Sequence, residues 1–273
     1  MLAFVPTPIG NLGDISFRTI EVLKDGELIF CEDTRITKKL ISLLSQHLEI
    51  EFPQFEYISV DSHNEKDFLT NDNKILLQTK KCIYMSDAGM PCVSDPGSFL
   101  VDFCLKNNIE YDVLPGANAI LTAYASSGFI NNATTFTFFG FLPHKGTNRS
   151  DMLNKVMNSE NLAILYESPH RLMKLIEEIN EYDSTREVFI TKELTKKYQS
   201  RYKGTVQSVL SEIKTTTIRG EWVVIIKNIE SLNRGIITEN DINELKLPPK
   251  QKAKILSKLT GKNVKDIYNN LIS

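Results

Sequence analysis

The stretch from Ser86 to Gly97 has the residue types and spacing best suited to chemistry, and it reads SDAGMPCVSDPG. A short apolar run from Cys82 to Met85 leads into it, and a helical pattern begins at Ser98. In α/β proteins, ligands bind at loops that follow the carboxyl ends of strands. Glycine lets a backbone approach a ligand closely, and proline holds a loop in one shape. The composition therefore predicts a ligand-binding loop, with a rigid turn as the alternative.

Five more polar loops follow predicted strands. They read PTPIGNLGD (Pro6 to Asp14), EDTR (Glu32 to Arg35), HNE (His63 to Glu65), LPGANA (Leu114 to Ala119) and YESPHR (Tyr166 to Arg171). Each has a structural alternative: a tight turn, acids that complement a helix N-terminus, or an ordinary surface histidine. Their recurrence at strand ends in both halves of the chain favours ligand binding over isolated turns.

A basic and aromatic segment, KELTKKYQSRYKG, runs from Lys192 to Gly204 and contains Tyr198 and Tyr202. Basic groups bind phosphates and aromatic rings stack on unpaired bases, so this segment suits RNA. It would equally suit an exposed amphipathic segment.

Short apolar strands alternate with helices between these loops. In the first half we expect strands at Leu2–Pro6 and Glu27–Glu32, a helix capped by Ser16, and helices at Ser98–Asn107 and Asn118–Ser126. This alternation predicts a mostly parallel sheet.

The second half repeats the alternation with different spacing. Its strands FTFFGF and WVVIIK could lie antiparallel, which predicts a mixed sheet, and helices are expected near Asp151–Met157, from Pro169 and near Val206–Ile213. Beyond Glu230, the chain predicts a helix, a turn at Gly261 and a second helix. The predicted domains are 1–127, 128–232 and 233–273.

Composition limits the class of protein. The chain has 273 residues, 41% of them hydrophobic, and no run long enough to cross a membrane, so we expect a cytoplasmic protein with a sizeable core. Its four cysteines show no paired spacing, which predicts reduced thiols and no metal.

Charge is unevenly distributed along the chain. The net charge is −2, but Lys246 to Ser273 carry seven lysines and one aspartate, a net +6, which leaves −8 on the remainder. A basic tail on an acidic body suggests an anionic partner such as RNA. A solvated lysine-rich helix face is the alternative.

Taken together, these motifs, with GFLP and KELTK, resemble the ribosomal RNA small subunit methyltransferase I family, within the tetrapyrrole-methylase class of S-adenosylmethionine enzymes. They occur in order from about Val5 to Ile226, and LPPKQKAKILSKLTG resembles that family's C-terminal extension. EDTR and YESPHR distinguish the chain from the precorrin methylases and diphthine synthase. It departs from the family at Met90, where threonine is usual, at LPGANA, and at His144, where arginine is usual.

The resemblance implies two α/β domains of the tetrapyrrole-methylase (class III methyltransferase) type plus a small C-terminal helical unit, in a homodimer. It also implies S-adenosylmethionine as cofactor and methylation of the 2′-hydroxyl of a cytidine in the decoding region of 16S rRNA. The cofactor-binding positions carried over are Pro8, Ile9, Gly10, Asp87, Ala88, Gly89, Met90, Asn118, Ala119 and Tyr166.

A ribose hydroxyl is a weak nucleophile, so a nearby base or cation should assist loss of its proton. The catalytic candidates are Asp33, Glu193 and Lys196, with ion pairs that frame the cleft as the alternative. The candidates for binding substrate are Arg35, His63, Asn64, Glu65, Arg171 and Lys192. Two rival functions stay open: a related methyltransferase that acts on a small tetrapyrrole or a protein, and a non-catalytic RNA-binding assembly factor, to which Met90 gives some weight.

Overall fold

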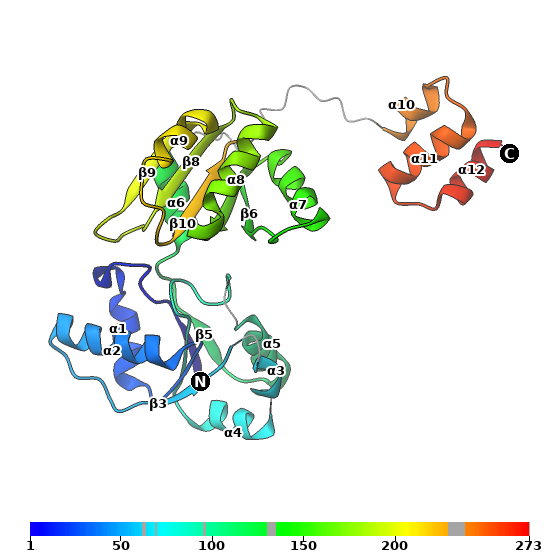
Figure 1. Cartoon of the computed structure of the whole chain (residues 1–273). Helices are drawn as coiled ribbons and strands as arrows, with labels where there is room; N and C mark the ends of the chain where they lie inside the picture. Colours follow the sequence, from blue (N-terminus) through cyan, green and yellow to red (C-terminus); the bar gives the residue numbers. More distant parts are fainter. Residues whose placement is uncertain (62–63, 69, 95–96, 130–134, 229–237, 273) are drawn as a thin grey trace. The chain divides into compact units, whose positions relative to one another are not determined.

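The computed structural model describes residues 1–61, 64–68, 70–94, 97–129, 135–228 and 238–272 (Figure 1). The chain forms two compact units, here called the α/β unit (Met1–Ile229) and the helical unit (Glu230–Ser273). The α/β unit contains two five-stranded sheets. The described residues of the helical unit form helices and no strands.

The first sheet is parallel throughout, in the order β3-β2-β4-β1-β5. Its strands are β1 (Leu2–Val5), β2 (Leu28–Cys31), β3 (Glu56–Ser59), β4 (Cys82–Met85) and β5 (Tyr111–Val113). Along β1, Leu2 and Phe4 join one buried cluster while Ala3 and Val5 join another, so both faces of the sheet are covered. Burial on both faces is typical of parallel sheets.

The helices of this half follow the strands in the predicted alternation. They are α1 (Phe17–Asp25), α2 (Thr34–Leu48), α3 (Glu65–Phe68), α4 (Asn71–Thr79), α5 (Ser98–Asn107) and α6 (Ala119–Ser127), with a short 3₁₀ turn at Leu12–Asp14. Ser16 caps α1 by accepting a hydrogen bond from the Thr19 amide, as expected.

The second sheet is mixed, as predicted, in the order β6-β7-β10-β8-β9. Its strands are β6 (Phe136–Phe141), β7 (Leu162–Glu167), β8 (Glu187–Lys192), β9 (Ser200–Thr205) and β10 (Trp222–Ile226). Strand β6 is parallel to β7, whereas β10 is antiparallel to both β7 and β8. The helices here are α7 (Thr147–Met157), α8 (Pro169–Tyr182) and α9 (Val206–Ile213).

The two faces of the second sheet are covered from different parts of the chain. Leu172 and Ile176 of α8 and Val209 of α9 pack on one face. Ile120 and Ala123 of α6, from the first half of the sequence, pack with strand residues of the other face. Helix α6 therefore couples the loop after β5 to the second sheet.

The helical unit contains α10 (Glu239–Glu244), α11 (Pro249–Thr260) and α12 (Val264–Ile272). Pro249 occupies the first turn of α11 and Gly261, with φ of 72°, ends it, so the predicted helix–turn–helix is confirmed. Helix α10 was not predicted. No helix of the described residues is long and apolar enough to cross a membrane.

Candidate functional site

A pocket of about 410 Å³ in the α/β unit is lined by segments that follow strands of the first sheet and by residues at the strand ends of the second sheet. Seven of the ten residues predicted to bind a cofactor lie on it: Ile9, Ala88, Gly89, Met90, Asn118, Ala119 and Tyr166. The other three, Pro8, Gly10 and Asp87, are chain neighbours of these wall residues. Four of the six strand-end loops that the sequence singled out thus meet at one cavity, whereas no described residue of EDTR or HNE contributes to its lining.

Two of these loops are joined by backbone hydrogen bonds. The Thr7 amide donates to the Gly89 carbonyl at 2.9 Å, and the Gly89 amide donates to the Thr7 carbonyl at 3.1 Å. Gly89 has φ of +84°, and a Cβ on it would lie 3.1 Å from Ile9 Cγ2. The backbone conformation therefore favours glycine, and the close approach leaves little room for a side chain. These backbone hydrogen bonds hold this part of the wall in place.

A third loop, between β8 and β9, packs tightly against Gly10. A Cβ on Gly10 would lie 2.8 Å from Thr195 Oγ1 and 2.9 Å from the Leu194 carbonyl oxygen. Glu193 and Thr195 have φ of 53° and 63°, in the left-handed region that non-glycine residues seldom adopt. Such strain is common at functional sites, and Leu194 lies on the pocket wall.

Glu193 and Lys196 form an ion pair in this loop. Lys196 Nζ donates to Glu193 Oε1 at 2.9 Å and to Glu221 Oε2 at 3.0 Å, and Glu221 is on the pocket wall. Burial favours the neutral acid at Glu193, but the hydrogen bonds from Lys196 and the Glu221 amide, together with the nearby lysine charges, outweigh it and lower the Glu193 pKa. Burial opposes the charge on Lys196, but its hydrogen bonds to the two glutamates raise its pKa. Both groups are therefore held charged at the pocket edge.

Asp33, the third catalytic candidate, has different neighbours. It caps α2 by accepting from the Arg35 amide at 2.8 Å, and its other oxygen pairs with Arg35 Nη2 at 2.6 Å. The hydrogen bonds from Arg35 lower the Asp33 pKa to about 2. The Asp33 amide donates a hydrogen bond to Asp87 Oδ1 at 3.2 Å. Burial nevertheless raises the pKa of Asp87. Among the described residues, no hydrogen bond or ion pair joins Asp33 to Glu193 or Lys196.

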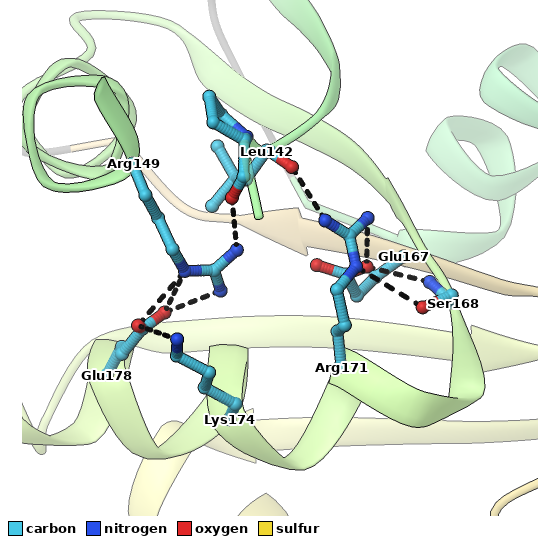
Figure 2. Close-up of polar contacts among 8 residues, drawn as sticks. Leu142, Arg149, Glu167, Ser168, Arg171, Lys174 and Glu178 are labelled. Carbon is cyan, nitrogen blue, oxygen red and sulfur yellow. Dashed lines mark hydrogen bonds and ion pairs between the residues drawn. The ribbon is translucent and has the colours of Figure 1, made fainter. Parts of the chain in front are cut away.

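Arg171 is turned inward. Its guanidinium pairs with Glu167 Oε1 at 2.7 Å and donates to the Leu142 carbonyl oxygen at 2.8 Å, and its side chain is 15% exposed (Figure 2). Arg149, from α7, forms a second buried pair with Glu178 on the same helix as Arg171 (Figure 2). Arg171 thus ties the end of β6 to the turn between β7 and α8.

The remaining substrate-binding candidates are dispersed. Lys192 Nζ donates to the Thr217 carbonyl at 2.7 Å and lies over the Trp222 ring. The Arg35 side chain is 89% exposed. Asn64 exchanges hydrogen bonds with Asp61 at the start of α3, whose first residue is Glu65. His63 lies outside the described residues.

Several wall residues were not predicted, among them Phe141, Glu167, Gly220, Glu221 and Trp222. Glu167 lies within the YESPHR motif, and its spacing of four residues from Arg171 was the available signal for their pairing. Trp222 is the single tryptophan of the chain. No local pattern marks it as part of a pocket, because the sheet pairing that places it there is long-range.

Comparison with known proteins identifies the family to which this fold and these motifs belong. The model of the tetrapyrrole (corrin/porphyrin) methylases matches residues 1–210. A solved cobalt precorrin-4 methyltransferase superposes with a TM-score of 0.59 at 14% identity, over 83% of this chain and 94% of its own. The two-sheet architecture of the α/β unit is therefore the tetrapyrrole-methylase fold.

Two relatives are closer in sequence, and both are named ribosomal RNA small subunit methyltransferase I. The protein of Campylobacter fetus subsp. fetus is 50% identical over 275 residues, covering 100% of both chains. The protein of Thermotoga maritima is 37% identical over 229 residues, covering 84% of this chain and 99% of its own.

Proposed function

Because this chain belongs to the tetrapyrrole methylase family, and within it to the ribosomal RNA small subunit methyltransferase I family, we propose that it uses S-adenosylmethionine to methylate the RNA of the small ribosomal subunit. The observation that carries this proposal is the pocket, which gathers seven of the predicted cofactor residues from loops far apart in the sequence. We assign the 2′-hydroxyl of a decoding-region cytidine as the target, as the motifs suggest.

The residues of the pocket fit such a cofactor. Its volume of about 410 Å³ is within the range of small-ligand sites, and its wall is mainly apolar with a few polar groups. The backbone at Gly89 and at Gly10 lies close to a neighbouring loop. A Cβ on Gly89 would crowd Ile9, and a Cβ on Gly10 would crowd Leu194. When bound, S-adenosylmethionine supplies an electrophilic methyl group. Ile9, Gly89, Asn118 and Tyr166 would hold it.

The chain's own contribution is positioning and electrostatics. Holding two reactants in line lowers a barrier by roughly 7–11 kcal/mol in favourable cases. Lys196 remains a cation at the pocket edge, held by Glu193 and Glu221. We assign it the role of stabilising the negative charge that develops on the ribose oxygen as its proton leaves. Asp33 and Glu193 have lowered pKa values and suit the anchoring of cations better than the removal of a proton.

RNA recognition is assigned to exposed basic surfaces. Arg201 of strand β9 is exposed, and so is Tyr198, three residues earlier in the chain. In the helical unit, Lys250, Lys254 and Lys258 are exposed along α11. Exposed lysines bind the phosphates of a nucleic acid and displace the counterions that surround it. In this proposal the chain binds 16S rRNA within the small subunit, and it is active as a homodimer.

The test is transfer of labelled methyl groups to small subunits that lack the modification, followed by mass mapping of the rRNA. A 2′-O-methyl cytidine in the decoding region is expected. Label in a tetrapyrrole or a protein instead, or RNA binding that is indifferent to S-adenosylmethionine, would contradict the proposal and favour one of the two rival functions.

A pair of glycine variants serves as control in the same loop. Gly10→Ala places a Cβ against the Leu194 carbonyl and should abolish transfer. Gly13→Ala meets only the Asn11 side chain, at 3.3 Å, and should retain it.

A further inference from the structure

Two polar atoms of pocket residues lack a hydrogen-bond partner in the part of the chain that the structure describes. They are Oε2 of Glu167 and Nε1 of Trp222, and both are shielded from solvent. The Glu167 side chain is 0% exposed. Burying a polar atom without a partner destabilises the folded state, so most buried polar atoms in native proteins are paired. Two such atoms on one pocket wall indicate that a ligand supplies their partners.

The two residues are direct neighbours across the sheet. Trp222 of β10 pairs with Glu167 of β7 in the antiparallel register, so their side chains emerge on the same face. The two buried atoms without partners therefore belong to neighbouring residues of the pocket lining, one a carboxylate acceptor and the other an indole N–H donor.

The Glu167 carboxylate is fixed in place. Its Oε1 accepts from the Ser168 amide at 2.8 Å and from Arg171 at 2.7 Å. Arg171 is itself held by the Leu142 carbonyl at 2.8 Å (Figure 2). One oxygen is thus occupied by the protein, while the other, Oε2, is buried without a hydrogen-bond partner among the described residues.

We propose that Glu167 and Trp222 recognise the edge of a nucleobase that carries an exocyclic amine beside an unprotonated ring nitrogen. The amine donates to Glu167 Oε2, and the ring nitrogen accepts from Trp222 Nε1. Adenine and cytosine share this edge, whereas hypoxanthine and uracil have a carbonyl oxygen and an N–H there. This inference rests on the proposed function, which brings an adenine with the cofactor and a cytosine with the substrate.

Glu167→Gln tests the proposal, because it preserves the shape and replaces a carboxylate by a neutral amide. Hydrogen bonds to charged groups are the stronger ones, so we expect about a tenfold or greater loss of affinity for the nucleoside recognised. The two measurements are the Kd of S-adenosylhomocysteine by calorimetry and the KM for small subunits at saturating cofactor. A rise in Kd identifies adenine, and a rise in KM alone identifies the target base. No change in either overturns the proposal.

Glu178→Gln is the matched control. Glu178 also pairs with a buried arginine, Arg149, and lies on α8, but it is not a wall residue. Its substitution should leave both constants unchanged.

Unmodified protein gives a second test that does not depend on a variant that folds. If the pair reads adenine, S-inosylhomocysteine, in which a carbonyl replaces the amine, should bind about tenfold or more weakly than S-adenosylhomocysteine. If it reads the target base, subunits with uridine at the target should lose kcat/KM to a similar extent. Equal performance in both comparisons overturns the proposal. Calorimetry does not require methyl transfer, so an S-adenosylhomocysteine complex without transfer would refute the proposed function while leaving the adenine assignment testable.

Discussion

Arg171, in the first turn of α8, pairs through its guanidinium with the carboxylate of Glu167, the last residue of β7, at 2.7 Å, and only 15% of the arginine side chain is exposed. An arginine that follows a strand end in a protein of this kind suggests a phosphate ligand, but this one has buried protein partners. Its contacts to Glu167 and Leu142 make it part of the pocket's frame.

Replacement of Arg171 by alanine should therefore reduce stability. Removal of one partner from a buried ion pair leaves an uncompensated charge, which costs about 3–5 kcal/mol. Urea denaturation should show a loss of that order. Lys106→Ala is the control, since its pair with Asp102 is 71% and 58% exposed and such pairs contribute about 0.3–0.5 kcal/mol. Equal losses in the two variants would show that Arg171 is not anchored as described.

The alternation of strands and helices follows directly from the sequence. Helices α5 and α9 begin and end at the predicted residues, because each apolar stripe is bounded by turn residues or a cap. Strand β9 was missed because it is an edge strand whose side chains are mostly polar and partly or fully exposed, apart from buried Tyr202. Helix α7 begins at Thr147, before the predicted Asp151, since its first turn is polar and follows Gly146.

The loops of the candidate site were visible for a physical reason: glycine and proline mark backbone that must bend at a strand end. What local sequence does not contain is pairing between distant strands. The register that sets Trp222 beside Glu167, and the packing of Gly10 against Leu194, join residues from different parts of the chain. Lys196 and Glu193 were named individually, but their common partner Glu221 emerges only from the folded loop.

Lys196→Met should reduce kcat more than it changes cofactor affinity. The cation is assigned to charge that develops on the ribose oxygen, and removal of such a stabilising group typically costs about 100-fold or more in rate. Single-turnover methyl transfer measures this, with S-adenosylhomocysteine affinity as the companion measurement. Lys197→Ala is the neighbouring control, because Lys197 contacts the exposed Tyr198 ring and should leave kcat unchanged. A normal rate in the Lys196 variant would remove it from the chemistry.

Asp33 and Asp87 should influence the pH dependence of stability in opposite directions. The Asp33 pKa is lowered from 3.8 to about 2, so its contribution is present above about pH 4 and is lost as the pH falls towards 2. The Asp87 pKa is raised, so its neutral form is favoured and stability is lost as the pH rises through its folded pKa. Asp33→Asn should therefore destabilise the protein most at neutral pH, and Asp87→Asn should stabilise it there. Thermal unfolding between pH 2.5 and 7 measures both, and slopes of the same sign would contradict the assignment.

The helical unit should contribute affinity for RNA but not chemistry. The Thermotoga maritima relative matches over 99% of its own length yet covers only 84% of this chain, so about a sixth of this chain lies outside the match. Replacement of Lys250, Lys254 and Lys258 by alanine should weaken binding to small subunits and reduce the dependence of log K on log salt by about 2 to 3. The Kd for S-adenosylhomocysteine should remain unchanged. The matched control replaces the exposed Lys24, Lys39 and Lys106 of the α/β unit, which removes the same charge. If both triple variants lose affinity equally, net charge and not the α11 surface determines binding.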